Sequence, residues 1–302
     1  MTLDRREMLR LAGVGCAALA TGVRPADAAK EPPGPVAPDA FAVLVDTVAC
    51  IGCRKCEWAC NVENRLSDAP AESFDDLKVV DTPRRPDHDA FTIVNRYRTP
   101  ADHDHSWTVK LQCMHCVDPA CASACLVGAL SKDEDGPVGY DAWKCIGCRY
   151  CMIACPFQIP AYEYAKPVEP RVRKCTFCEP RLDEGRSPAC VAICPNEALT
   201  FGTRQELLDA AHTRIQGTPD RYFPHVYGEF EAGGTCWLYL APVDFKYTGL
   251  PALDEKPIPH HTERIQHAIF KSFVPPLALY GVLGLIMHAL RGEDGHQETH
   301  RG

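Results

Sequence analysis

The chain has 302 residues, enough for one large domain or two smaller ones. Its formal net charge of −8 at pH 7 excludes nucleic acid as the expected partner, because a surface that binds nucleic acid needs an excess of basic residues. Aromatic residues make up only 8% of the chain, whereas 18 residues are cysteine. We therefore expect bound metal to take over part of the organising role of an apolar core.

The N-terminus has the three parts of an export signal. Arg5 and Arg6 lie in a short charged region, an apolar stretch covers residues 11–23, and Ala26-Asp27-Ala28 has the A-x-A pattern of a cleavage site. The paired arginines resemble those of a Tat signal, the route by which folded proteins are exported. Residues 1–28 are therefore predicted to be a Tat signal peptide, with a Sec signal or an uncleaved anchor as alternatives.

Four groups of four cysteines account for sixteen of the eighteen cysteines. A proline-rich linker over residues 29–40 and a predicted strand over residues 41–46 precede the first group. A polar, proline-containing segment over residues 65–106 and a predicted strand over residues 107–111 precede the second. The groups are Cys50, Cys53, Cys56 and Cys60; Cys113, Cys116, Cys121 and Cys125; Cys145, Cys148, Cys151 and Cys155; and Cys175, Cys178, Cys190 and Cys194.

The spacing of the first and third groups is C-x2-C-x2-C-x3-C, as in bacterial ferredoxins. There the first three thiolates bind one 4Fe–4S cluster and the fourth binds the neighbouring cluster. The same crossed rule predicts four clusters here, at sites that we number 1 to 4. Site 1 is Cys50, Cys53, Cys56 and Cys194; site 2 is Cys60, Cys175, Cys178 and Cys190; site 3 is Cys113, Cys116, Cys121 and Cys155; site 4 is Cys125, Cys145, Cys148 and Cys151.

Zinc is the main alternative metal for an isolated CxxC pair, but zinc sites rarely use this repeated spacing. The two remaining cysteines are expected to bind no metal. Cys16 lies in the predicted signal peptide, and Cys236 is interpreted as a small buried apolar residue.

The order of the groups predicts how the fold is built. Groups two and three are joined by a strand, a turn and a strand, and residues 107–165 are expected to form one ferredoxin-like unit. That unit is inserted in a second unit that contains groups one and four, and both lie within residues 41–202. Residues 203–262 form a C-terminal extension, which opens with a capping box at Thr203-Arg204-Gln205-Glu206 and contains a strand near residues 236–240.

The run over residues 273–290 has no Asp, Glu, Lys or Arg. Its length is near the lower limit of the ~17–25 residues that cross a membrane. Residues 263–291 are therefore predicted to be a membrane anchor helix followed by a polar tail over residues 292–302, with a buried helix of the globular domain as the alternative. The predicted fold class is α+β, with two interleaved bacterial-ferredoxin-like units, a C-terminal extension and one C-terminal transmembrane helix.

No catalytic residue is predicted in this chain. No phosphate loop, zinc-protease helix or nucleophile elbow occurs. Catalytic clusters leave one iron open to substrate by binding only three cysteines, whereas every cysteine group here has four. His115 lies between two predicted ligands and is expected to pack or to tune a potential rather than to bind iron. Electron transfer is favoured over two alternatives, a redox enzyme in its own right and a scaffold with structural clusters.

The four groups resemble those of the iron–sulfur electron-transfer subunits of membrane-bound respiratory oxidoreductases, above all the hydrogenase-2 type. Residues 112–119, 201–207 and 224–229 look like that family, whereas Leu126 departs from its usual Pro. The resemblance implies a subunit on the periplasmic side of the bacterial cytoplasmic membrane, anchored by its tail. It implies electron flow from nickel–iron hydrogenase catalytic subunits to an integral membrane quinone-reactive subunit, with group one nearest the former and groups two and three nearest the membrane. The β subunit of a formate dehydrogenase, or of a related molybdopterin oxidoreductase, is the alternative.

Overall fold

The computed structural model describes residues 39–100, 102–260 and 278–288. The chain divides into two compact units, of which one covers residues 33–260. The other consists of residues 1–32 and 261–302, and its described part is residues 278–288. The predicted signal peptide, all but the end of the predicted linker, and the predicted polar tail lie outside the described residues.

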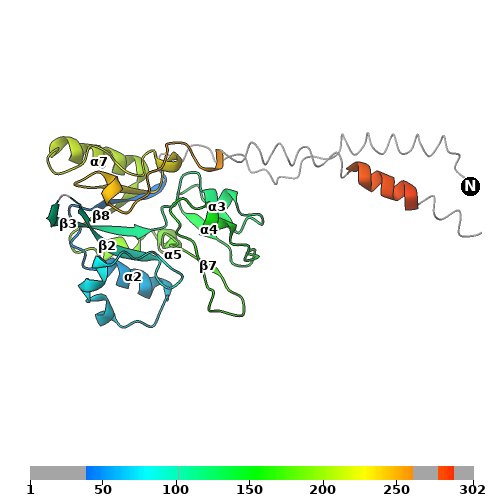
Figure 1. The fold of residues 1–302 in the computed structure, drawn as a ribbon, viewed down its shortest axis with the longest axis horizontal. Helices are drawn as coiled ribbons and strands as arrows, with labels where there is room; N and C mark the ends of the chain where they lie inside the picture. Colours follow the sequence, from blue (N-terminus) through cyan, green and yellow to red (C-terminus); the bar gives the residue numbers. More distant parts are fainter. Residues whose placement is uncertain (1–38, 101, 261–277, 289–302) are drawn as a thin grey trace, which may run out of the picture. The chain divides into compact units, whose positions relative to one another are not determined.

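The larger unit contains a three-stranded sheet in the order β8-β1-β9, and Figure 1 shows its strand β8 below α7. β1 (Phe41–Asp46) confirms the predicted first strand, and it pairs antiparallel with β8 (Leu199–Thr203). On its other side β1 pairs parallel with β9 (Trp237–Leu240), so the C-terminal extension contributes a strand to the same sheet as the start of the fold. The extension is therefore an integral part of this unit.

The expected capping box opens α7 (Arg204–Gly217), which packs against β1. The Thr203 side chain accepts a hydrogen bond from the Glu206 backbone N–H at 3.3 Å, and the Glu206 carboxylate accepts one from the Thr203 N–H at 3.2 Å. Both contacts satisfy amide groups at the start of the helix that have no partner within it. The helix thereby begins at a defined position on the sheet.

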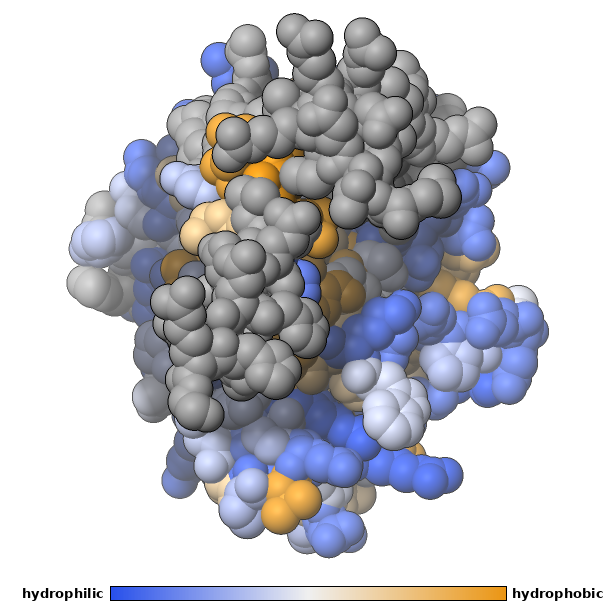
Figure 2. All heavy atoms as spheres, turned by 90° about the vertical axis from the view of Figure 1, so that its right-hand side faces the viewer, coloured by the Kyte–Doolittle hydropathy of each residue, from blue (hydrophilic) through white to orange (hydrophobic). Residues whose placement is uncertain are grey.

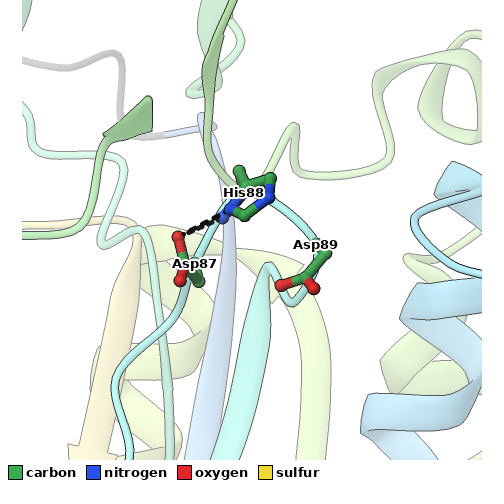
Figure 3. A group of neighbouring side chains, drawn as sticks. All are labelled: Asp87, His88 and Asp89. Atoms are coloured by element: carbon green, nitrogen blue, oxygen red, sulfur yellow. Dashed lines mark hydrogen bonds and ion pairs between the residues drawn. The ribbon is translucent and has the colours of Figure 1, made fainter. Parts of the chain in front are cut away.

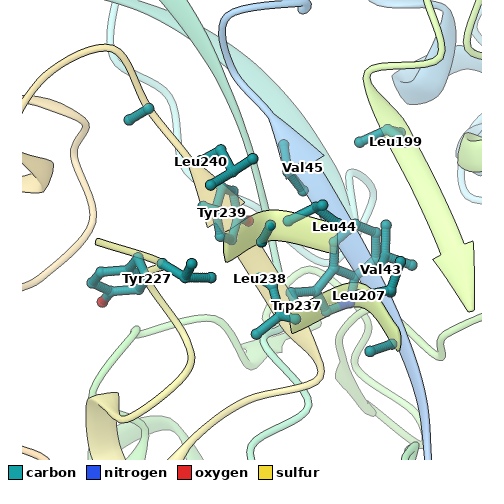
Figure 4. Packing of buried hydrophobic residues seen from close by; sticks show 14 of the residues in the cluster. Val43, Leu44, Val45, Leu199, Leu207, Tyr227, Trp237, Leu238, Tyr239 and Leu240 are labelled. Atoms are coloured by element: carbon teal, nitrogen blue, oxygen red, sulfur yellow. The ribbon is translucent and has the colours of Figure 1, made fainter. Parts of the chain in front are cut away.

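The main apolar core lies around this sheet. Val43, Leu44 and Val45 of β1 and all four residues of β9 are fully buried, and Leu199 and Leu207, which are also buried, pack in the same cluster (Figure 4). Because neighbouring strand residues point to opposite faces, burial of every residue means that both faces of the sheet are covered. Cys236 is also buried, as expected for a small apolar residue.

A hairpin of β2 (Thr92–Thr99) and β3 (Asp102–Gln112) provides a second sheet. The predicted strand over residues 107–111 lies within β3, whereas β2 was not predicted and falls in the segment interpreted as a polar connector. The short 3₁₀ helices η1 (Ala71–Phe74) and η2 (Leu77–Asp81) precede β2. β2 packs against α2 (Lys55–Asn64), the helix that follows the first cysteine loop.

The remaining elements are short, and several carry cysteines. α2 packs against α6 and α3 packs against α4, which brings group one beside group four and group two beside group three. This is the expected pairing of groups, while the bounds of the two units stay a prediction.

The short elements of the larger unit are α3 (Ala120–Ser123), α4 (Tyr150–Ala154), α5 (Glu179–Asp183), α6 (Ala189–Ala192), η3 (Glu231–Gly233), η4 (Phe245–Tyr247), and the strand pairs β4 (Leu130–Lys132) with β5 (Val138–Tyr140) and β6 (Ala161–Tyr162) with β7 (Val172–Arg173).

The predicted transmembrane helix is wrong, and the fold class is corrected to a mixed α/β fold without it. Among the described residues, none of the helices has the length and apolar character that crossing a membrane requires. Within the predicted range 263–291, the described helix is residues 278–288, and the rest of that range lies outside the described residues.

Candidate metal centres

Site 1 lies in the loop that directly follows β1. Cys50, Cys53 and Cys56 of this loop line a pocket with Cys194, the predicted crossed ligand from group four. Gly52 has φ +70°, and a Cβ added there would lie 2.8 Å from Thr108 Cγ2 of β3. The Thr108 hydroxyl donates a hydrogen bond to the Cys50 carbonyl at 2.9 Å. The loop is therefore held closely against β3, with its thiols turned to a common pocket.

Site 2 forms where α2 meets the fourth group. Cys60, which is buried in α2, lies close enough to Cys175, Cys178 and Cys190 for their thiols to interact electrostatically. The Asn64 side-chain amide lies 3.6 Å from the Cys60 sulfur, and the Phe177 N–H donates to the Cys175 sulfur at 3.4 Å. The structure thus places the crossed cysteine of group one among three cysteines of group four.

Sites 3 and 4 show the same crossed arrangement in the second and third groups. Cys155 interacts with Cys116, which also interacts with Cys113 and Cys121. The structure likewise brings Cys125 together with three cysteines of group three, which are Cys145, Cys148 and Cys151. All four predicted sets therefore consist of neighbouring thiols. That each set binds a cluster stays a prediction.

The thiols of Cys60, Cys151 and Cys175 have little tendency to ionise by themselves. Burial first, and the Cys113 thiol second, raise the pKa of Cys175 to about 12. Burial, followed by the thiols of Cys125 and Cys145, raises the pKa of Cys151 to about 11. Burial likewise holds the pKa of Cys60 well above its usual value. Thiolates in such positions need a cation that replaces their protons, as a bound metal does.

The donor set fits iron–sulfur clusters. All sixteen predicted ligands are free cysteines, and soft thiolates in sets of four are the usual ligands of 4Fe–4S clusters. A buried lysine, Lys110, lines the site 1 pocket beside the cysteines. A positive charge in this position suits a centre that is anionic when assembled.

His115 lies between Cys113 and Cys116 and is fully buried. Its Nδ1 accepts a hydrogen bond from the Val138 N–H at 2.9 Å, and its ring packs edge-on against Phe177 with centroids 4.9 Å apart. Burial first, and the charge of Lys174 second, hold the pKa of His115 well below its usual range, so the ring is neutral. These contacts agree with the packing role expected for this residue.

A network of buried charged residues around the first cysteine loop was not recognised in the sequence. Glu57 forms ion pairs with Arg54 at 2.9 Å and with Arg84 at 2.6 Å. The only local signal was that Arg54 directly follows the predicted ligand Cys53 and Glu57 directly follows Cys56, which did not show that they are buried. Lys110 and its partner Gln112 were also missed, because β3 was recognised only by its alternating pattern.

Asp87, His88 and Asp89 form a second cluster of possible metal ligands (Figure 3). They lie on the turn before β2, where Asp87 and Asp89 are exposed and His88 is half-buried. His88 Nδ1 lies 3.0 Å from the Asp87 carboxylate, so these two side chains already satisfy each other. Exposed acidic groups of this kind are common without a bound ion, and we assign no role to the cluster.

Comparison with known proteins places these sites in a family. Residues 106–204 match the family described as a 4Fe-4S dicluster domain. A protein of Nitratidesulfovibrio vulgaris is 52% identical over 262 residues, which cover 86% of this chain and 70% of the relative. The nitrate-inducible formate dehydrogenase iron-sulfur subunit of Escherichia coli K12 is 34% identical over 275 residues, which cover 86% of this chain and 89% of the relative.

The similarity extends over almost the whole chain for one relative. The Hydrogenase-2 operon protein HybA of Escherichia coli O157:H7 is 34% identical over 327 aligned positions, which cover 97% of this chain and 98% of HybA. This confirms the resemblance stated for the cysteine groups and their flanking residues. The chain therefore belongs to the family of hydrogenase-2 type iron–sulfur proteins, which are electron-transfer subunits of respiratory oxidoreductases.

Proposed function

We propose that this chain transfers electrons through four 4Fe–4S clusters, from the catalytic subunits of a nickel–iron hydrogenase to an integral membrane quinone-reactive subunit. The similarity to HybA over nearly the full length of both chains supports the hydrogenase as donor. When bound, clusters of this type supply one-electron redox chemistry at potentials of roughly −700 to +450 mV. No catalytic residue of this chain is part of the proposal.

The proposal depends mainly on the continuous order of the four sites. Cys56 of site 1 interacts electrostatically with Cys190 of site 2. Cys175 of site 2 interacts with Cys113 of site 3, and Cys121 of site 3 interacts with Cys151 of site 4. Each site therefore has a neighbour within the range of thiol–thiol interaction, in the order 1, 2, 3, 4. Electron tunnelling requires such short steps between successive centres.

The burial of the sites suits this order. The cysteines of site 2 are all buried, whereas Cys50 and Cys53 of site 1 are partly exposed and Cys148 of site 4 is exposed. Sites 1 and 4 are thus the ends at which electrons enter and leave. Large hydrophobic side chains are exposed close to the site 4 cysteines in sequence, and such groups mark surfaces that bind partners. They are Leu126, Trp143, Ile146, Tyr150 and Ile153.

In the lower part of Figure 2, small hydrophobic areas lie among hydrophilic ones. The exposed hydrophobic residues near site 4 favour a membrane subunit there and the catalytic subunits near site 1.

The proposal includes export to the periplasmic side of the cytoplasmic membrane. It rests on the paired arginines Arg5 and Arg6 and on the Ala26-Asp27-Ala28 motif. Replacing both arginines with lysine is expected to leave the full-length precursor in the cytoplasm. Processing and export of this double variant at the normal level would contradict the Tat assignment.

A formate dehydrogenase, or a related molybdopterin oxidoreductase, is the second candidate donor. The 34% identity to a formate dehydrogenase iron-sulfur subunit over 86% of this chain favours it specifically. The two candidates differ in the catalytic subunits that purify with the chain. They also differ in whether hydrogen or formate reduces the chain in the purified complex.

The experiment that tests the function uses the purified complex with its quinone-reactive subunit. Hydrogen is expected to reduce quinone in this complex, whereas the chain alone turns over neither hydrogen nor formate. Cys145→Ser, at site 4, is expected to leave the complex assembled but to abolish quinone reduction. Normal quinone reduction by this variant would contradict electron transfer through site 4.

A further inference from the structure

Lys110 is a buried lysine with only neutral hydrogen-bonding and ring partners. Its exposed fraction is 1%, and it lies on β3 opposite Val94 of β2. Its Nζ donates a hydrogen bond to the Gln112 side-chain oxygen at 2.9 Å and lies 4.2 Å from the centre of the Trp237 ring. Across the described residues, no carboxylate is within ion-pair distance of it. A buried charge without a counter-charge is unfavourable, so this ammonium needs an anionic neighbour.

The position of Lys110 identifies that neighbour. The residue lines the site 1 pocket together with the four predicted ligands of site 1. Its ammonium also interacts electrostatically with Cys190 and Cys175 of site 2. Lys110 therefore lies between two of the four predicted centres.

A closed set of hydrogen bonds holds Lys110 in place. The Gln112 side-chain amide donates to the Tyr239 hydroxyl at 2.6 Å, and this hydroxyl donates to the Lys110 backbone carbonyl at 2.9 Å. The set links β3 to β9, both of which belong to the buried part of the fold. The nearby carboxylate of Glu57 is already paired with two arginines. The charge of Lys110 thus has a fixed position and is directed to the cysteine sites.

We propose that Lys110 is a shared internal counter-charge of sites 1 and 2 that favours their reduced form. This inference rests on the proposed function, because it requires clusters at those sites. Reduction of a site adds one electron and one negative charge, and no proton is required. A buried ammonium attracts this added charge more strongly than an exposed one, since little water screens it. Lys110 therefore raises the midpoint potentials of sites 1 and 2 above the values that they have without it.

The lysines near site 3 are bound differently. Lys174 Nζ donates to the Val138 and Cys175 carbonyls, and Lys132 Nζ donates to the His115 and Gly136 carbonyls. Neutral backbone oxygens accept from these two cations, and both cations interact electrostatically with thiols of site 3, Lys174 with Cys121 and Lys132 with Cys116. The thiols that interact with Lys110 belong to sites 1 and 2, so we expect its effect to be confined to these two clusters.

The test is a redox titration of the purified complex, followed by EPR. Lys110→Met removes the charge but keeps a similar side-chain length, and Lys110→Arg keeps the charge. Lys246→Met is the matched control, because Lys246 is exposed and pairs with Asp244 at 3.1 Å. Each of sites 1 and 2 is compared at the potential where it is half reduced in the wild type. There Lys110→Met is expected to lower the ratio of reduced to oxidised form at least tenfold, which corresponds to a fall of the midpoint potential by about 59 mV.

The expected pattern has three further parts. The other two clusters keep their wild-type midpoints in Lys110→Met, Lys110→Arg stays close to the wild type, and Lys246→Met matches it. A fully loaded Lys110→Met complex with four unchanged midpoints would overturn the inference but not the proposed function. A wild-type complex without four clusters would instead overturn the proposed function.

Loss of clusters in a variant is also informative. Lys110→Gln is a second neutral variant that can still hydrogen-bond to Gln112. Loss of the clusters of sites 1 and 2 in both neutral variants, with retention in Lys110→Arg, supports a requirement for the charge. Loss in all three variants would assign the role of Lys110 to packing and would contradict the inference.

Discussion

The Glu57→Ala substitution tests how the chain holds its first cysteine loop. The Glu57 side chain is 4% exposed and forms ion pairs with Arg54 at 2.9 Å and with Arg84 at 2.6 Å. It also accepts a hydrogen bond from the Val94 N–H of β2 at 2.7 Å. Arg54 lies inside the loop of site 1, and its side chain is only 7% exposed. The carboxylate thus neutralises a buried cation beside the cysteines.

The expected cost follows from these exposures. Without Glu57, the guanidinium of Arg54 keeps its charge in a buried position, which typically costs about 3–5 kcal/mol of folding free energy. Arg84 is 26% exposed, so losing its ion pair with Glu57 costs less, because water partly screens its charge. We therefore expect Glu57→Ala to lower the free energy of unfolding by about 3–5 kcal/mol. Glu57→Gln is expected to cost less, because its amide oxygen still accepts from the arginines.

The assay is anaerobic guanidinium unfolding of the cluster-loaded protein, followed by circular dichroism and by cluster absorption. Asp81→Ala is the matched control, since Asp81 is 44% exposed and pairs with Arg96 at 2.8 Å on the surface. Exposed pairs of this kind contribute about 0.2–1 kcal/mol. Equal losses in Glu57→Ala and Asp81→Ala would refute the reasoning from burial.

Two further predictions concern the ligand sets and their loops. Cys194→Ser is expected to remove one cluster, or about four irons, while Cys236→Ser is expected to leave the iron content unchanged; equal iron in both variants would show that Cys194 is not a ligand. Gly52→Ala is expected to weaken the site 1 loop by more than the ~1–2 kcal/mol of a left-handed residue alone, because its Cβ would lie 2.8 Å from Thr108 Cγ2. Gly185→Ala, at φ +69° with nothing within 4 Å of its Cβ, measures the backbone cost alone, so equal unfolding free energies for the two variants would argue against the contact.

Elements with strong local signals could be predicted from the sequence. The apolar run over residues 41–46 is a strand, and the Thr203–Glu206 capping box starts α7. The cysteine spacing also predicted which thiols lie together, as shown by Cys60 among the cysteines of group four. In each case the determining residues are close in sequence or have a spacing tied to one geometry.

Features that depend on distant residues could not be predicted in this way. β9 was expected as a strand, but its parallel place beside β1 depends on residues almost two hundred positions earlier. β2 was missed because its segment is polar and rich in proline, and its Val94 N–H is satisfied by Glu57 of another element. The burial of Lys110 depends on its network with Gln112 and with Tyr239 of β9, which no local pattern indicates.

The prediction of a membrane helix was wrong because it relied on one local pattern. The run over residues 273–290 has no acidic residue and no Lys or Arg, and this pattern alone led to the prediction. The pattern does not establish that a membrane-crossing helix forms, and none of the helices among the described residues has the length and apolar character to cross a membrane. Absence of charge was therefore a weaker signal than the spacing of the cysteines, which involves a specific geometry.

The measurement that tests the central claim most directly is the iron and acid-labile sulfide content of the purified chain, combined with EPR of its reduced form. Four clusters predict about sixteen irons and about sixteen sulfides per chain, with the spectrum of magnetically interacting 4Fe–4S centres. About eight irons or fewer per chain, in protein that retains its full complement of cysteines, would contradict the assignment of sites 1 to 4.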